Sequence, residues 1–364
     1  MSETHVAWIV QKTGSGAVTQ ARRVAEQIDA RVTLVAGDSL DVEAATPGVH
    51  ATNGVYHPTD DLDRLLRSFD PVPDVTVFHN YNAHIVESAP RIQTWCPTAV
   101  RVGMNFAEAA SLPGAMAQDV PGIIEFVRQH DALIAPSEAA ARDLRAVGVE
   151  DGRITVIPTL VDMSDPVEPE LNAPYTVGHV AERCSPLKNQ HLTVKVAAAL
   201  RHLDPTYRAA VNITGRESQY RKTLQLTAAK LNVADLCRFV GYVDDMAEFW
   251  EGTGVNVLPS HSERHPSVVM EAARAGVPTV AAETEWAAEF DTVPTEPVDD
   301  PWSWAETVHS LLTNDARRAR LAHDQQQEAI ERFSADAVAP KYAALFEDLC
   351  DRVATFKADP EVVA

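Results

Sequence analysis

The chain has 364 residues, of which 45% are apolar, so it is long enough for two domains and can bury a large core. Its net charge of −21, from 31 basic and 52 acidic residues, argues against a nucleic-acid partner, because phosphate binding needs a basic surface. Only 7 of the basic residues are lysines, a pattern typical of proteins kept soluble in high salt, although a solvated acidic surface explains the charge equally well.

Short runs rich in valine and isoleucine alternate with helical patterns along the chain. Continuous apolar strands between helices are typical of parallel sheets covered on both faces, and the length accommodates two such sheets. A polar, proline-rich segment over residues 161–175 is expected to link the two halves, and a long amphipathic tail follows residue 333, interrupted by Pro340. The expected strands are VAWIVQ (6–11), RVTLVAG (31–37), DVTVFHN (74–80), ALIAP (132–136), YTVGHV (175–180), AVNITG (210–215), CRFVG (237–241), VNVLP (255–259) and PTVAA (278–282).

Other features of the sequence favour a protein of the cytoplasm. No apolar run approaches the roughly 20 residues needed to span a bilayer. The first ten residues, MSETHVAWIV, lack the basic start of a secretory signal. The cysteines form no C-x-x-C pair, which argues against a disulfide framework and a zinc site. They are Cys96, Cys184, Cys237 and Cys350.

Two loops after expected strands carry candidate phosphate-binding groups, because ligands of open α/β sheets bind at the carboxyl ends of the strands. The first, residues 11–23, holds Gly14 and Gly16 before a helix; its backbone N–H groups could meet a phosphate, but an ordinary tight turn is the simpler reading. The second places Arg183 and Lys188 before a helix beginning near Asn189. Two cations there could hold a diphosphate, or could be solvated surface charges.

The stretch SERHPSVVMEAARAG, residues 262–276, is predicted to form a helix that begins at Pro266 and ends before Gly276. The first free N–H groups of that helix, at Ser267 and Val268, would point toward the preceding loop. That loop contains Glu263. The helix start is therefore suited to a phosphate.

Glu271 lies among apolar residues of the same expected helix. A buried carboxylate without a partner is costly, so this one needs a hydrogen-bond donor. Backbone groups or a nearby arginine such as Arg274 could supply it. Alternatively, Glu271 accepts hydrogen bonds from sugar hydroxyls.

Taken together, these segments resemble glycosyltransferase family 4, retaining enzymes of the GT-B fold, over essentially the whole chain. The most specific match is the E-x7-E motif, formed by Glu263 and Glu271 and followed by a small-residue helix, EAARAGVPTVAA. AERCSPLKN resembles the family's R-x4-K segment. LIAPSEAAARDL and GRITVIPTLVD resemble its serine-containing strand–helix unit and its exit from the first domain.

The resemblance implies an α/β protein of the GT-B fold. Its two Rossmann-like doubly wound domains would face a central cleft, and a C-terminal helix would cross back to the N-terminal domain. We accordingly expect an N-terminal acceptor-side domain over residues 1–165 and a nucleotide-sugar-binding domain over residues 166–332. A C-terminal helical segment over residues 333–364 should return to the N-terminal domain.

The resemblance also assigns roles to individual residues. Arg183 and Lys188 match the pair that neutralises the donor's diphosphate, and Glu263 matches a carboxylate near the hydroxyls of the transferred sugar, so these three form the expected catalytic set. Glu271 matches the carboxylate that binds the nucleotide ribose.

The resemblance extends to the loop after the first strand, but the sequence departs from the family's pattern at several positions. Gly14 and Gly16 fall where the family's glycine-rich loop approaches donor and acceptor. The family's Thr-x-His has no histidine in the matching TAVRVGMNF, and His79 resembles a different, upstream histidine. Arg264 and His265 replace the usual glycine after the first motif glutamate. These changes affect the expected sugar and acceptor more than the nucleotide site.

The expected activity is retaining transfer of a sugar from a UDP- or GDP-sugar to a glycan, lipid-linked or small-molecule acceptor. Two alternatives stay open: a non-catalytic homologue that binds nucleotide or glycan, and a nucleotide-sugar epimerase of the same fold. Oligomeric state and peripheral association with a membrane are also left open, although no polybasic amphipathic helix is present.

No cofactor and no metal are expected for this activity. Arg183, Lys188 and the helix start after Pro266 would together roughly balance a diphosphate. The chain's paired aspartates adjoin helical or proline-bearing segments, where aspartate serves equally well as a helix cap. These pairs are Asp60–Asp61, Asp244–Asp245 and Asp299–Asp300.

Overall fold

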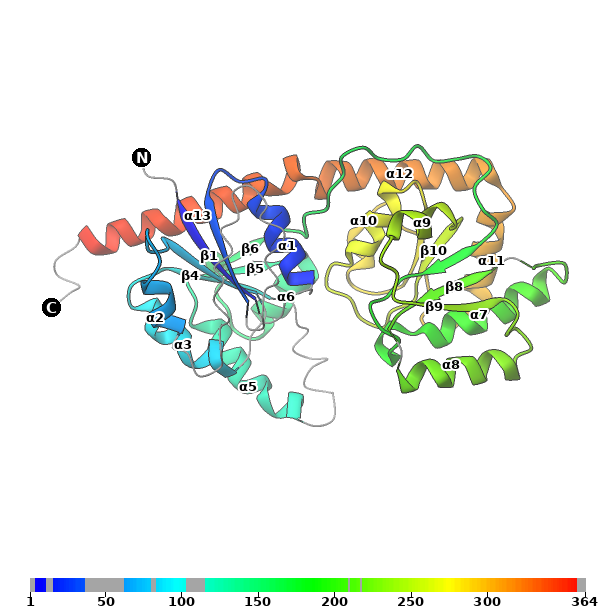
Figure 1. Ribbon diagram of the computed structural model, residues 1–364, viewed down its shortest axis with the longest axis horizontal. Coiled ribbons are helices and arrows are strands. Elements are labelled where there is room, and N and C mark those ends of the chain that lie inside the picture. The colour runs from blue at the N-terminus through cyan, green and yellow to red at the C-terminus, as the bar shows by residue number, and fades with distance from the viewer. Residues whose placement is uncertain are drawn as a thin grey trace. The chain divides into compact units, whose positions relative to one another are not determined.

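The computed structural model describes residues 4–10, 16–36, 62–79, 83–102, 115–208, 210–216 and 218–358. The chain forms two compact units: unit 1 comprises Met1–Asp162 and Ser334–Ala364, and unit 2 comprises Met163–Phe333. In the described part of each unit, six strands form one sheet in which every pairing is parallel (Figure 1). The expectation of two parallel sheets in an α/β protein is therefore confirmed.

The sheet of unit 1 has the strand order β2-β1-β3-β4-β5-β6. Its second strand, β1, is buried along its whole length, and Val6 lies opposite Val32 on one side and Val75 on the other. Burial on both faces explains why these strands are apolar without alternation. The strands are β1 (His5–Val10), β2 (Arg31–Ala36), β3 (Val75–His79), β4 (Thr98–Arg101), β5 (Ala132–Ala135) and β6 (Ile154–Val156).

The C-terminal helix α13 (Ala335–Ala358) packs on unit 1 (Figure 1). The ring of Tyr342 lies 5.6 Å from that of Trp8 in β1, and Phe346 packs edge-on against the same tryptophan. The expectation that Pro340 interrupts this pattern is wrong: α13 runs through it. The break lies earlier, at Ser334 after α12 (Asp315–Phe333), and wholly buried residues hold α13 to the core on both sides of the proline.

The remaining helices of unit 1 connect successive strands. In α6, for example, the Ser137 side chain caps the first turn by accepting a hydrogen bond from the N–H of Ala140 at 3.1 Å. The described helices are α1 (Gly16–Ala25), α2 (Leu62–Arg67), α3 (Ala83–Gln93), α5 (Ala115–Arg128), α6 (Glu138–Ala146) and the 3₁₀ turn η1 (Asp151–Arg153).

The sheet of unit 2 has the order β12-β11-β10-β7-β8-β9. Its strands are β7 (Val177–His179), β8 (Val211–Thr214), β9 (Cys237–Gly241), β10 (Val255–Leu258), β11 (Thr279–Ala282) and β12 (Thr295–Glu296). Its helices are α7 (Gln190–Leu203), α8 (Gln219–Lys230), α9 (Met246–Glu251), α10 (Ser267–Arg274), α11 (Pro301–Leu312) and α12, with the 3₁₀ turns η2 (Pro186–Lys188) and η3 (Ala287–Glu289).

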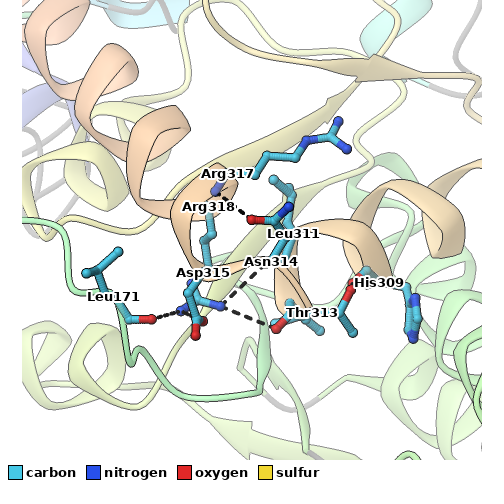
Figure 2. A network of polar contacts seen from close by, with 9 residues as sticks. Leu171, His309, Leu311, Thr313, Asn314, Asp315, Arg317 and Arg318 are labelled. Atoms are coloured by element: carbon cyan, nitrogen blue, oxygen red, sulfur yellow. Dashed lines mark hydrogen bonds and ion pairs between the residues drawn. The ribbon is translucent and has the colours of Figure 1, made fainter.

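The expected linker, residues 161–175, contains no helix or strand but is fastened to unit 2 over much of its length. The Arg318 side chain is 2% exposed, donates a hydrogen bond to the carbonyl of Leu171 at 3.0 Å and pairs with Asp315 at 2.6 Å (Figure 2). The Gln326 amide donates to the carbonyl of Val167 at 2.8 Å. A buried guanidinium needs several acceptors, and the Leu171 carbonyl of the linker is one of them.

The described residues bear on two expectations, one about membrane-spanning helices and one about the cysteines. Within these ranges no helix has both the length and the apolar character that crossing a bilayer requires. The cysteines are free thiols, and all but Cys350 are buried.

Candidate active site

The predicted donor-site residues lie at one edge of the unit 2 sheet. Because β10, β7 and β8 are parallel neighbours, the loops that follow them leave the sheet at the same edge. Arg183 and Lys188 follow β7, Glu263 follows β10, and Glu271 lies in α10 beyond that loop. The carboxyl edge of a parallel sheet is where such folds bind ligands.

The loop after β7 is held by backbone contacts rather than left free. Arg183 forms an isolated parallel bridge with Arg216, and its carbonyl accepts a hydrogen bond from the Gln190 side chain at 3.2 Å. Gly215 has φ +133°, and a Cβ atom there would lie 2.8 Å from the backbone nitrogen of Cys184, so only glycine fits. These contacts fix the backbone from which the exposed Arg183 side chain extends.

Lys188 and Glu263 bind each other. The Lys188 Nζ donates to the Glu263 Oε1 at 2.5 Å, with side-chain exposures of 30% and 12%. A backbone hydrogen bond from the N–H of His261 to the carbonyl of Leu187, at 3.0 Å, joins the same two loops. Sequence reasoning missed this pair, because the adjacency of β7 and β10 brings together residues 75 positions apart.

The helix α10 begins one residue later than expected. Pro266 has ψ 107°, which is extended, so it is the N-cap and Ser267 is the first helical residue. Ser267 and Val268 form the first turn and are half-buried. Gly276, with φ +71°, follows the helix end in the left-handed conformation, as its position predicted.

Glu271 is half-buried, so the expectation of a buried carboxylate is wrong. The reason is the amphipathic pattern of α10. Met270 and Ala272 are buried in the core, whereas Glu271 lies on the partly exposed side of the helix. Arg274, the alternative structural partner, donates its Nε to the carbonyl of Ser164 at 2.9 Å.

In unit 1 the candidate groups are described only in part. Gly14 lies outside the described residues, and Gly16 is the first residue of α1. His79 ends β3 with 8% exposure; burial, followed by the charge of Arg101, lowers its pKa well below the ordinary value. The imidazole is therefore neutral at pH 7.

Two of the three aspartate pairs cap helices. Asp245 accepts hydrogen bonds from the N–H groups of Ala247 and Glu248 at 3.0 and 3.2 Å, and Asp300 caps α11 in the same way. Asp60–Asp61 lies outside the described residues. Over the ranges that the structure covers, no group of three or more histidine, cysteine, aspartate or glutamate side chains could hold a metal ion.

Comparison with known proteins supports the family resemblance. Residues 168–328 match the family model described as glycosyl transferases group 1. The D-inositol 3-phosphate glycosyltransferase of Xylanimonas cellulosilytica is 31% identical over 258 residues, which cover 64% of this chain and 61% of that protein. The enzyme of the same name from Nocardiopsis dassonvillei is 30% identical over 224 residues, or 54% and 51%. The chain thus spans between half and two thirds of the length of these relatives.

Solved structures resemble the chain over nearly its full length. The Anabaena protein HepE, solved in complex with UDP and glucose, has a TM-score of 0.76 at 16% identity, covering 95% of this chain and 100% of its own. Sucrose-phosphate synthase from Thermosynechococcus elongatus has a TM-score of 0.74 at 16% identity, covering 95% and 99%. At such identities the likeness shows the fold, and the prediction of a GT-B fold is confirmed.

Proposed function

We propose that this chain is a retaining glycosyltransferase, because residues 168–328 match the model of the group 1 glycosyl transferases. Its donor is a UDP- or GDP-sugar, and its acceptor is a glycan, a lipid-linked saccharide or a small molecule. The glycosyltransferase names of the curated relatives support this class of reaction. HepE, solved with UDP-glucose, makes UDP-sugars the first donors to test.

One observation carries the proposal. Arg183, Lys188 and Glu263 lie on loops that leave neighbouring strands at the same edge of the unit 2 sheet, and α10 begins directly after the Glu263 loop. This edge combines two cations with a helix N-terminus, which suits the two phosphates of a nucleotide sugar. The carboxylates of the same edge suit hydroxyl donors on the ribose and on the sugar.

The proposed reaction breaks the bond between the anomeric carbon and the diphosphate. Arg183 and Lys188 neutralise the charge that develops on the departing diphosphate, while Glu271 fixes the ribose and Glu263 the sugar. The acceptor oxygen attacks the face from which the diphosphate leaves, and a phosphate oxygen takes the acceptor's proton. The protein contributes mainly positioning and charge stabilisation, so no side chain has to act as a base.

A nucleotide-release assay tests the proposal. Panels of UDP- and GDP-sugars with candidate acceptors should yield free UDP or GDP together with a glycosylated product. Arg183→Ala and Lys188→Ala should each lower turnover at least ~100-fold, as loss of one oxyanion donor does. Lys195→Ala, on the exposed face of α7, is the matched control and should leave turnover unchanged.

The outcomes separate the alternatives. Binding of nucleotide without release from any sugar would favour a non-catalytic homologue. Conversion of the donor into a different nucleotide sugar, seen by product analysis, would favour an epimerase. Turnover that survives both Arg183→Ala and Lys188→Ala would contradict the placement of the diphosphate.

The proposed mechanism needs no divalent metal. Arg183 and the dipole of α10 offer positive charge to the diphosphate, and Lys188 adds its own once the diphosphate takes it over from Glu263. We therefore expect little loss of turnover after exhaustive treatment with EDTA. Abolition of turnover by EDTA, with recovery on adding Mg²⁺ or Mn²⁺, would contradict this part of the proposal.

A further inference from the structure

Lys188 and Glu263 form an ion pair within the proposed donor site itself. Their 2.5 Å contact joins the loops after β7 and β10, which the backbone hydrogen bond between His261 and Leu187 also joins. Both side chains are more than two thirds covered. A charge-assisted hydrogen bond at this depth is stronger and less screened by salt than a surface pair.

We propose that Glu263 is the internal counter-ion of Lys188 and competes with the nucleotide's diphosphate for it. In the free enzyme the carboxylate holds the ammonium, and in the donor complex the diphosphate takes over that contact. This inference rests on the proposed function, because it takes Lys188 as a diphosphate ligand. Glu263 then acts as a positioning residue that sets how tightly the site holds a nucleoside diphosphate.

The chemistry of the lysine side chain suits this exchange. An ammonium carries three N–H donors, so Lys188 can turn from a carboxylate oxygen to a phosphate oxygen by rotation of its terminal bonds. Until then Glu263 keeps the half-buried cation paired and oriented, which avoids an uncompensated charge. A diphosphate that enters meets a carboxylate at short range and is repelled by it.

The proposed competition should affect the affinity for the nucleotide sugar less than the affinity for the nucleoside diphosphate product. When a sugar is attached, its hydroxyls can donate hydrogen bonds to Glu263 and so offset the loss of the lysine contact. After transfer the sugar is gone, and Glu263 can reclaim Lys188 from the nucleoside diphosphate. The pair should therefore weaken binding of the product more than binding of the donor, and so speed product release.

Neutralising the carboxylate tests this role. Glu263→Gln keeps the shape of the side chain and removes its charge, so UDP or GDP should bind about 3- to 10-fold more tightly, as expected for removal of one partly covered charge. Calorimetry on the full chain gives the dissociation constants. Glu263→Asp keeps the charge and should show no such gain, and turnover should fall in both variants.

Two further variants separate the competition from a general loss of negative charge. In a Lys188→Met background, the gain in nucleotide affinity from Glu263→Gln should shrink, because no ammonium is left for which the carboxylate and the diphosphate could compete. Asp235→Asn breaks another carboxylate–cation pair, with Arg201 at 2.6 Å, in the loop before β9 at the opposite edge of the same sheet. That variant removes the same charge and should leave the nucleotide affinity unchanged.

These measurements separate the counter-ion role of Glu263 from the proposed function. If Lys188→Met weakens nucleotide binding but Glu263→Gln does not strengthen it, the counter-ion role is wrong and the proposed function stands. If neither UDP nor GDP binds the wild type, both are wrong. Thermal unfolding checks each variant, and Glu263→Ala is measured in parallel, so that a folding failure of one substitution does not leave the question open.

Discussion

At the scale of single residues, the sequence predicts which side chains carry chemistry but not how they pair. Arg183, Lys188 and Glu263 could be chosen from residue type and family spacing. The bond between Lys188 and Glu263 could not, because it depends on β7 lying beside β10. The half-exposed position of Glu271 was also missed, since an apolar neighbourhood in sequence does not say which side of an eight-residue helix faces the core.

Glu271 gives the first prediction at this scale. If it accepts hydrogen bonds from the ribose, Glu271→Ala should weaken UDP or GDP binding by about 1–3 kcal/mol, the range for hydrogen bonds to a charged group. The wild type should lose a similar amount toward a 2′,3′-dideoxy nucleotide, and the variant should not discriminate. Glu251→Ala, on the exposed surface of α9, serves as control. Equal affinities of Glu271→Ala and the wild type would contradict the assignment.

His179 gives the second prediction at this scale, which concerns the pH dependence of stability. It is fully buried at the end of β7, its Nδ1 lies 2.7 Å from the Thr193 Oγ1, and burial, followed by the charge of Lys188, lowers its pKa to about 3 from 6.5. Between pH 3 and 6.5, His179 is therefore protonated in the unfolded chain but neutral in the folded chain. Stability falls as the pH drops through this window, and at pH 5 the loss from this one group is up to about 2 kcal/mol.

The measurement is the free energy of unfolding between pH 7 and pH 5. His179→Gln should show a shallower decline than the wild type. Identical slopes for His179→Gln and the wild type would show that His179 does not titrate as its burial implies.

At the scale of elements, apolar runs predicted nine strands in the correct order, because parallel strands buried on both faces must be continuously apolar. The strand β4 was harder to recognise, since Thr98 and Arg101 are polar at its two ends. Both are buried through specific partners: the Thr98 N–H donates to the Asp131 carboxylate at 2.8 Å, and Arg101 donates to the carbonyl of Ile157 at 3.0 Å. Tertiary contacts of this kind leave no local pattern in the sequence.

The docking of α13 on unit 1 is testable through one hydroxyl. The Arg101 guanidinium, 3% exposed, donates to the hydroxyl oxygen of Tyr342 at 2.7 Å. Tyr342→Phe keeps the ring packing against Trp8 but leaves a buried charged donor short of an acceptor. We expect a loss of about 1–3 kcal/mol in the free energy of unfolding of unit 1. Glu347→Gln, exposed on the same helix, should change it by less than about 0.5 kcal/mol. A Tyr342→Phe variant as stable as the wild type would show that the hydroxyl contributes nothing to docking.

At the scale of the whole molecule, the alternation of strands and helices was enough to predict two sheets, and the most specific motif behind the family resemblance lies in unit 2. The family model matches residues 168–328, which lie within unit 2. The glycine-rich loop of unit 1 lies partly outside the described residues. The acceptor is therefore the part of the proposed function that the sequence constrains least.

The net charge of −21 gives the last prediction, because repulsion of this size acts over the whole folded molecule. The Debye length is about 30 Å at 0.01 M salt and about 3 Å at 1 M, so like charges repel across a unit in dilute buffer and hardly at all in molar KCl. Unfolding separates these charges, and dilute buffer therefore favours the unfolded chain. We expect the midpoint of thermal unfolding to climb by many degrees between 0.01 M and 1 M KCl, with most of the rise at the lower concentrations, where screening changes fastest. Sucrose stabilises by exclusion from the protein surface and does not screen charge, so it should give no such early rise. A midpoint that stays flat across this range of KCl would show that the acidic surface is ordinary solvated composition, without any dependence of the fold on salt.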